Sequence, residues 1–425
     1  MAPDESEPPP RVSTRAARKT VGPALKDTEP GIDMAALRAY RLGRVREQLK
    51  ARDIAAAVLF DPVNIRYATA TRNMAVWTLH NAARYAFVAA DGPVVMFDFH
   101  NSAHLSEGLG TVDEVRPARS WFYFAAGPNV AERARTWAGE IAELVRVHGG
   151  GSRRVALDHC DPPGADALRG HGLELTDGQE VLERARCIKS AEEIACMGHA
   201  IAVAEAGMAG MREALKPGLT ENELWAILQD TNTRMGGEWI ETRLLASGGR
   251  TNPWFQEASD RVIRAGELVA YDTDMVGPFG YCADVSRTHF CGPGRPSAAQ
   301  KELYSMAYDQ VQTNMGLLRP GLTFREFAER GYRMPERCRP NRYSVQAHGV
   351  GFCDEYPHCA FLDDIDTAGY DGVFESGMVV CVESYMGEVG GEEGVKLEEQ
   401  VLITEDGIER LSTFPYEDDL LTREV

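Results

Sequence analysis

Residues 271–284 read YDTDMVGPFGYCAD, and this stretch constrains the fold of the whole chain. It places three aspartates, Asp272, Asp274 and Asp284, in a segment that is otherwise apolar and rich in glycine. Burying an ionised carboxylate is costly unless a cation compensates its charge. Because no lysine or arginine stands between the first and the last of these aspartates, the compensating charge must come from elsewhere.

A second set of polar residues follows apolar stretches nearer the C-terminus. The run 379–382 leads into Glu383, and Glu398 precedes another apolar run. Between them, His348 stands in the stretch AHGVG (347–351), where glycines leave room for a close ligand. Five carboxylates and one imidazole suit two divalent cations bridged by carboxylates, although some of these acids could be ordinary surface or salt-bridged groups. The predicted metal ligands are Asp272, Asp274, Asp284, His348, Glu383 and Glu398.

A faint internal repeat suggests how acids that lie far apart in the sequence could meet. Residues 216–224 (KPGLTENEL) resemble 319–327 (RPGLTFREF), each with a Pro-Gly helix stop, a threonine N-cap and a glutamate three residues later. Residues 266–272 (GELVAYD) resemble 377–383 (GMVVCVE), each a turn glycine and an apolar strand that ends in a carboxylate. Two matches in the same order indicate two similar half-domains that face each other.

Composition narrows the class of protein. The chain has 425 residues, 44% of them hydrophobic, which is enough for two domains with full cores. Its formal net charge of −19 repels phosphate backbones and anionic lipid, so we expect no nucleic acid or membrane partner. The sequence contains no uninterrupted apolar stretch of about 18 residues and no secretion signal. Nine cysteines without a CxxC pair indicate reduced thiols, which predicts a cytoplasmic location.

Periodicity divides the chain into three parts. Residues 1–33 predict a tail, either disordered or an arm that packs on a partner subunit. Residues 34–187 alternate between helical and extended patterns, and residues 188–425 open with a helix whose Ser190 and Glu193 have capping-box spacing. In the middle part we predict helices at 34–50 and 130–147, strands at 55–60 and 155–157, and a hairpin of 85–90 and 94–98.

The order of acids and histidine resembles the pita-bread metalloenzymes, which include methionine aminopeptidase, prolidase, aminopeptidase P and creatinase. Their pattern is approximately D-x-G-x5-G-Y-x-x-D, G-H-G-x-G, an E-P strand end and a final R-x-E, and it covers about residues 188–412 here. The resemblance implies an α+β fold: a C-terminal pita-bread domain with pseudo-two-fold symmetry, preceded by a smaller α/β creatinase-like domain. It also implies metal ligands at Asp272, Asp284, His348, Glu383 and Glu398.

Three departures from this pattern separate the chain from the peptidases. The glycine of D-x-G is Asp274 here, which adds a sixth ligand. Asp354 stands where the peptidases have a catalytic histidine. Where prolidase-like enzymes carry a substrate-binding histidine after a proline, Pro253 is followed by Trp254 and Phe255. Those two histidines hold the peptide carbonyl and stabilise the tetrahedral intermediate, so their loss removes the equipment for acyl transfer.

This combination closely resembles the DddP-type dimethylsulfoniopropionate lyases, which cleave their zwitterionic substrate to acrylate, dimethyl sulfide and a proton. The resemblance implies a metal-dependent carbon–sulfur lyase in which Asp354 removes the Cα proton beside a metal-bound carboxylate. It suggests iron as the metal, with zinc, manganese and cobalt as alternatives. The rival interpretation is a dimetal Xaa-Pro peptidase or dipeptidase of the prolidase type; a creatinase-like hydrolase and a non-catalytic binding protein fit less well.

The sulfonium of such a substrate has no hydrogen-bond donor, so aromatic rings are its natural partners. The predicted contacts are Tyr343, Trp77 and Trp254, with Trp121 and Phe122 as alternatives; each could instead be a core or surface aromatic. Related enzymes form dimers in which the N-terminal domain reaches the partner's active site, so we expect a homodimer in which Trp77 acts across the interface. His289 and His358 are expected to lie outside the ligand set.

Overall fold

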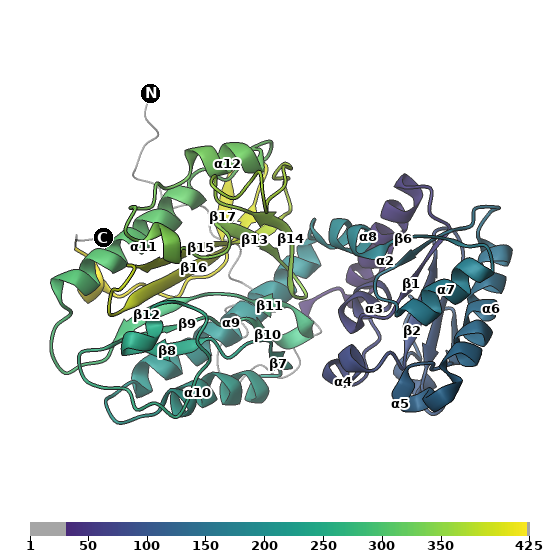
Figure 1. Cartoon of the computed structure of the whole chain (residues 1–425), viewed down its shortest axis with the longest axis horizontal. Helices are drawn as coiled ribbons and strands as arrows, with labels where there is room; N and C mark the ends of the chain where they lie inside the picture. The colour runs from purple at the N-terminus through teal and green to yellow at the C-terminus, as the bar shows by residue number, and fades with distance from the viewer. Residues whose placement is uncertain (1–30, 423–425) are drawn as a thin grey trace. The chain divides into compact units, whose positions relative to one another are not determined.

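The computed structural model describes residues 31–422. Most of the predicted tail, residues 1–30, therefore lies outside the described residues. The chain divides into two compact units, Asp33–Arg186 and a second that contains Cys187–Val425 (Figure 1).

The N-terminal unit is a six-stranded mixed sheet in the order β4-β3-β2-β1-β5-β6, with helices packed against it. Its strands are β1 Ala56–Leu59, β2 Tyr85–Ala89, β3 Val94–Asp98, β4 Glu114–Pro117, β5 Arg154–Leu157 and β6 Glu174–Asp177. Its helices are α2 Met34–Ala51, α3 Pro62–Thr69, α4 Ala75–His80, α5 Tyr123–Ala126, α6 Val130–His148, α7 Pro162–Gly170 and α8 Gly178–Arg186. The two helices, two strands and one hairpin predicted for this part are confirmed.

Local sequence signals account for these elements. Asp33 caps α2, since its carboxylate accepts hydrogen bonds from the first backbone N–H groups of the helix. β1 pairs with β2 antiparallel and with β5 parallel, as an alternating α/β pattern requires. Trp121 is buried in the core of this unit, with its ring against Phe60 and Trp137. Of the aromatic residues considered as substrate contacts, Trp121 is therefore a core residue.

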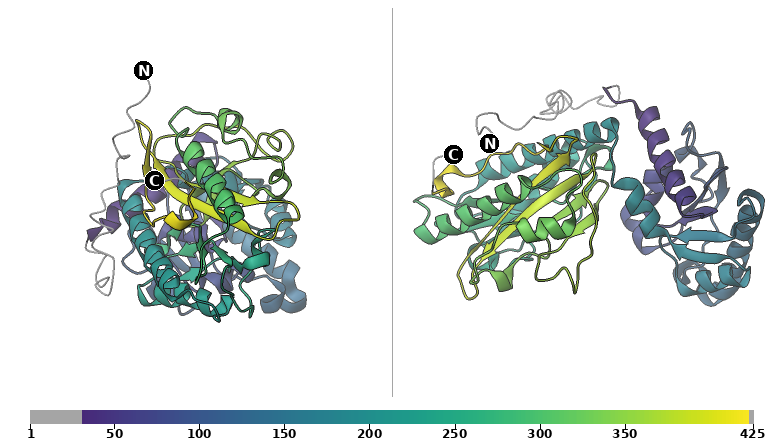
Figure 2. Two further views of the ribbon diagram at one scale, coloured as in Figure 1. Left: turned by 90° about the vertical axis from the view of Figure 1, so that its left-hand side faces the viewer. Right: turned by 90° about the horizontal axis from the view of Figure 1, so that it is seen from above.

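The C-terminal unit holds three sheets, ordered β11-β10-β7, β12-β9-β8 and β14-β13-β15-β16-β17. The long strands β15 and β16 run alongside α11 (Figure 2). Its helices are α9 Ala191–Ala214, α10 Glu221–Arg234, α11 Ala298–Met315 and α12 Phe324–Arg330. Its strands are β7 Trp239–Ile240, β8 Leu245–Ser247, β9 Leu268–Tyr271, β10 Met275–Val276, β11 Cys282–Ala283, β12 Arg287–Phe290, β13 Ala347–Val350, β14 Asp354–Cys359, β15 Val379–Gly387, β16 Gly394–Ile403 and β17 Ile408–Arg410.

Helix α9 is the central helix of the first half. A capping box of Ser190 and Glu193 opens it, as predicted. It has the length and mean hydropathy, 1.4, of a membrane-spanning helix, but 61% of that apolar window is buried inside the structure. It packs against α10 and β11, so its apolar character serves the core of this unit.

The internal repeat corresponds to matching structure in the two halves. Thr220 is the N-cap of α10, where it forms a capping box with Glu223, and it makes an isolated β-bridge with Val262. Thr323 does the same at the start of α12 and bridges Val373. In each half, a β-bridge therefore joins the start of a helix to the segment that precedes a core strand. This repetition confirms the predicted pseudo-symmetry.

The turn glycine before each core strand also repeats. Gly266, before β9, has a φ of 88°, and Gly377, before β15, has a φ of 89°. Each donates its N–H across the sheet, to the carbonyls of Cys291 and Ile403 respectively. A glycine is needed at both places because other residues adopt this left-handed conformation only at a cost. The two strands therefore leave matching turns, and each leads to a carboxylate of the candidate site.

Gly266→Ala and Gly377→Ala test this turn geometry as a matched pair. A Cβ at residue 266 would meet no heavy atom within 4 Å, whereas one at residue 377 would lie 2.9 Å from Ile188 Cγ2. We expect Gly266→Ala to cost about 1–2 kcal/mol from backbone strain alone, and Gly377→Ala to cost more. Urea unfolding of the purified proteins measures both; equal stability of the variants and the parent would contradict this account of the turns.

Candidate metal centre

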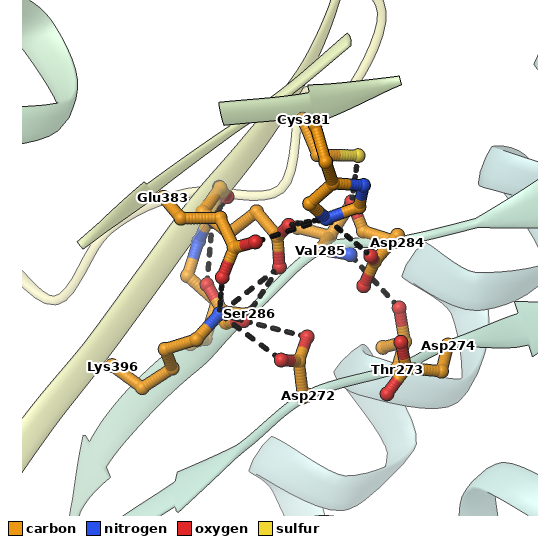
Figure 3. Close-up of polar contacts among 12 residues, drawn as sticks. Asp272, Thr273, Asp274, Asp284, Val285, Ser286, Cys381, Glu383 and Lys396 are labelled. Atoms are coloured by element: carbon orange, nitrogen blue, oxygen red, sulfur yellow. Dashed lines mark hydrogen bonds and ion pairs between the residues drawn. The ribbon is translucent and has the colours of Figure 1, made fainter. Parts of the chain in front are cut away.

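The six predicted ligands meet in one buried cluster, although they come from both halves of the C-terminal unit (Figure 3). Ligand atoms lie within 4.8 Å of one another in three overlapping groups. The groups are Asp272, Asp274 and Asp284; Asp272, Glu383 and Glu398; and Asp284, His348, Cys381 and Glu398. The shared members mean that two neighbouring positions could each be surrounded by several carboxylate oxygens.

His348 presents one ring nitrogen to the acids. Its Nε2 lies 2.9 Å from Glu383 Oε1 and 3.5 Å from Asp284 Oδ2. Its Nδ1 lies 3.0 Å from the backbone carbonyl of Gly349. When Nδ1 donates to that carbonyl, Nε2 keeps a lone pair directed at the acids, which is the arrangement of a metal-binding imidazole.

Without a cation the acids repel one another. Burial, and then the neighbouring Glu398, raise the pKa of Asp272 to about 7. Burial and nearby carboxylates also raise the pKa values of Asp274 and Asp284 well above their ordinary value. In addition, Glu383 and Glu398 stand directly opposite each other on β15 and β16, where like charges are destabilising. A bound cation would therefore stabilise the ionised form of these carboxylates.

Several carboxylate oxygens also lack hydrogen bonds. Oδ1 of Asp284 is buried and has no hydrogen-bond partner among the described residues. Both oxygens of Glu383 and Oε1 of Glu398 accept no hydrogen bond of good geometry there, and they lie only within ion-pair distance of Lys396 or His348. Buried polar atoms are normally satisfied, so exceptions in native structures require an explanation such as an ion. Oxygen donors with one imidazole are a set that divalent first-row cations accept. The residues present therefore fit a divalent metal site.

Lys396 is a cation at this site that was not predicted from the sequence. Its fully buried Nζ lies 2.8 Å from Glu383 Oε2, 3.0 Å from Asp272 Oδ2 and 3.3 Å from Glu398 Oε2. Burial opposes its charge, but these carboxylates raise the pKa of Lys396 well above its ordinary value. One ammonium balances one of the five carboxylates, so four negative charges are left to balance when all five are ionised.

Three site residues that were not predicted share a simple sequence relation to the ligands. Lys396, Ser286 and Cys381 each stand two residues from a predicted ligand, and side chains two apart on a strand point to the same face. Ser286 Oγ lies 2.6 Å from Asp272 Oδ1, and Cys381 Sγ donates to the backbone carbonyl of Asp284. The period-two rule, applied outward from each acid, would have found all three.

Asp274 occupies a backbone position that favours glycine. Its φ is 33°, in the left-handed region, and its side chain accepts a hydrogen bond of 2.5 Å from Thr242 Oγ1. Residues held in such conformations cluster at functional sites, where surrounding structure stabilises them. The chain therefore carries a carboxylate at a backbone position that favours glycine, the residue of the D-x-G pattern that it resembles.

Asp354 lies at the edge of the cluster. Its Oδ1 is 3.7 Å from His348 Nδ1, and 56% of its side chain is exposed. The next residue of β14, Glu355, forms a buried ion pair with Lys189. This ion pair fixes the strand immediately after Asp354. Asp354 is thus in reach both of the ligand cluster and of solvent.

The aromatic residues predicted to bind substrate lie in different surroundings. Tyr343 is beside the cluster, with its ring centroid 4.6 Å from Lys396 Nζ. Trp254 is only 5% exposed and packs with Tyr385 and Ala270. Trp77 belongs to α4 of the N-terminal unit, so its predicted contact with substrate stays a prediction.

His289 and His358, the two histidines expected to lie outside the ligand set, are not in the ligand groups of the described residues. His289 is buried between the Tyr271 hydroxyl, at 3.0 Å, and the Glu417 carboxylate, at 2.7 Å. His358 is exposed on β14. Both positions agree with the expectation that neither residue is a ligand.

Asp274→Asn and Asp274→Gly test the repulsion within the cluster. After removal of metal with a chelator, we expect both variants to unfold at a higher temperature than the parent, because one buried negative charge is gone. A relief of about 1 kcal/mol corresponds to roughly 2–4 °C in a domain of this size. Asp363→Asn, which changes an exposed acid paired with Arg339, serves as the control. Lower melting temperatures for both Asp274 variants would contradict the repulsion.

Two family descriptions match the chain, and a solved structure shares its fold. Residues 195–405 match the metallopeptidase family M24, and residues 41–188 match the creatinase/prolidase N-terminal domain. An Xaa-Pro dipeptidase from Bacillus anthracis superposes with a TM-score of 0.71 at 22% sequence identity, over 89% of this chain and 99% of that one. The predicted pita-bread architecture is therefore confirmed.

Two curated proteins are similar to this chain over most of their length. They are the dimethylsulfoniopropionate lyases DddP of Roseovarius nubinhibens and of Roseobacter denitrificans. Each is 42% identical over 396 residues, which are 92% of this chain and 89% and 88% of those proteins. The similarity to the dipeptidase structure, at about half that identity, carries the fold alone.

Proposed function

Because this chain belongs to the family of the dimethylsulfoniopropionate lyase DddP, within the pita-bread superfamily, we propose that it is a lyase that cleaves dimethylsulfoniopropionate to acrylate and dimethyl sulfide. The observation that carries the proposal is the position of Asp354. It lies at the edge of a buried ligand cluster, at the place where the resemblance puts a peptidase's catalytic histidine.

Two divalent ions per chain are the proposed cofactors. Their ligands are Asp272, Asp274, Asp284, His348, Glu383 and Glu398, which form the overlapping groups described above. Two divalent ions and the Lys396 ammonium together balance the five carboxylates, which supports this stoichiometry. Iron is the proposed metal, following the family resemblance, and zinc, manganese and cobalt suit the same donors.

The proposed reaction is a β-elimination with Asp354 as the base. Bound divalent ions would supply Lewis acidity that draws charge from the substrate carboxylate and acidifies the neighbouring Cα–H. The Asp354 carboxylate takes the Cα proton, and the C–H electron pair becomes the Cα–Cβ double bond. The Cβ–S bond breaks with its pair on sulfur, so neutral dimethyl sulfide leaves. Asp354 then returns its proton to water, for which its half-exposed side chain is suited.

Aromatic residues are proposed to hold the sulfonium. Tyr343 is supported by its place beside the ligand cluster, where its ring already lies close to a cation. Trp254 belongs to a small apolar cluster against which Tyr343 packs, so its proposed role is to hold the Tyr343 ring in place. We further propose a cytoplasmic homodimer in which Trp77 of one subunit contributes to the site of the other; the free state of all nine cysteines agrees with a reducing compartment.

Asp354→Asn is the direct test of the proposed base. Since the amide cannot accept a proton at neutral pH, release of dimethyl sulfide should fall by at least two orders of magnitude. The metal content should stay near that of the parent, because Asp354 is not one of the proposed ligands. Gas chromatography of the headspace and elemental analysis of the same samples measure the two quantities, with Asp363→Asn as a surface control.

Substantial residual lyase activity in Asp354→Asn would remove Asp354 from the role of base. The peptidase alternative is tested on the parent protein with an Xaa-Pro dipeptide under the same conditions. Dipeptide hydrolysis without release of dimethyl sulfide from dimethylsulfoniopropionate would replace the lyase proposal with a prolidase-type activity.

A further inference from the structure

Phe255 is a large aromatic residue in an unfavourable conformation on the surface. Its φ is 71°, in the left-handed region, which is a genuine outlier for a bulky side chain. It is nevertheless 58% exposed, so burial of its ring does not account for the strain. The neighbouring Trp254 is buried instead. A conformation of this kind persists where function or surrounding structure requires it.

The ring of Phe255 is joined to the candidate metal centre through Tyr343. The two rings stack with centroids 5.2 Å apart and an interplanar angle of 23°. Tyr343 in turn lies over Lys396, whose ammonium contacts three of the proposed ligands. Burial, and then the nearby Glu383, raise the pKa of Tyr343, so its ring stays a neutral phenol. Together the two rings form an aromatic surface that leads from the ligand cluster toward solvent.

The outer part of this surface, the ring of Phe255, is its more exposed part. Tyr343 already has the Lys396 ammonium over its ring and the Phe255 ring stacked on it. Tyr343 is partly buried beside these groups, whereas Phe255 is more than half exposed and offers more of its ring to solvent. A cation that carries only methyl groups has no hydrogen-bond donors, and an exposed aromatic face is a suitable contact for it.

We propose that Phe255 is a specificity-determining residue that contacts the cationic end of a short carboxylate whose β-carbon carries a sulfonium or quaternary ammonium group. The strained backbone holds the ring against Tyr343, on the solvent side of the site. The carboxylate end of the same ligand points to the ligand cluster, where bound divalent ions would supply Lewis-acid positions for its oxygens. This inference rests on the proposed function, because it places the substrate's carboxylate at the metal centre.

A pair of ligands of the same shape isolates the effect of charge. 3-(Trimethylammonio)propanoate and 4,4-dimethylpentanoate are both carboxylates, and neither carries a sulfonium leaving group. They differ in the end group, which has a quaternary nitrogen in the first and a quaternary carbon in the second. We call them the cationic and the neutral member after that end group. Calorimetric titration of the metal-loaded parent should show tighter binding of the cationic member. Phe255→Leu should weaken binding of the cationic member by about threefold to tenfold and leave the neutral member nearly unchanged, whereas Phe255→Trp should keep the preference. Phe124→Leu, at another exposed phenylalanine, should change neither value.

Phe255→Gly adds a readout that a merely structural role would not produce. Glycine adopts a φ of 71° without strain, so this variant should melt no lower than Phe255→Leu while it loses the preference for the cationic ligand. A cationic preference that is intact in Phe255→Leu, or a loss of affinity that is equal for both ligands, would overturn the inference. Neither of those results would affect the lyase proposal, which instead fails if the parent releases no dimethyl sulfide; binding of the ligand pair is measured independently of that turnover.

Discussion

The structure of the C-terminal unit depends on one electrostatic constraint, the confinement of five carboxylates in a buried space. Lys396 neutralises one of them, and the remaining repulsion appears in the raised pKa values of Asp272, Asp274 and Asp284. Such an arrangement is tolerated only if the backbone holds it and a cation completes it. The paired turns, capping boxes and long β15–β16 ladder provide the first requirement, and the buried Asp284 Oδ1, which has no partner among the described residues, indicates the second.

The pita-bread fold can support different chemistry because the residues that depart from the peptidase pattern, Asp274 and Asp354, lie around the ligand cluster and not in its core strands. Asp274 has a left-handed backbone between β9 and β10, so its carboxylate joins the cluster from a short link between two strands. Asp354 stands on a strand that the buried pair of Lys189 and Glu355 anchors. A carboxylate at this edge can accept a proton but, when ionised, cannot donate one to an oxyanion. This property supports the proposal of proton abstraction beside a metal-bound carboxylate over amide hydrolysis.

Much of this site could be predicted from the sequence, because each ligand ends or interrupts an apolar strand and the repeat aligns the strands. Lys396, Ser286 and Cys381 obey the strand period, but the ligand pattern selects only carboxylates and imidazoles and so does not predict them. The aromatic contacts could not be resolved in the same way. Pro253 is followed by two aromatic residues, and the sequence does not distinguish the buried Trp254 from the exposed Phe255 with its positive φ.

The central claim is that the carboxylate cluster works as a two-metal centre for β-elimination. Chelator-stripped protein should be titrated with a divalent ion, iron(II) first, while release of dimethyl sulfide and bound metal are measured in the same samples. The account predicts no activity in the stripped protein and a rise to a plateau at two equivalents per chain. Full activity without metal, or a plateau at one equivalent, would contradict it.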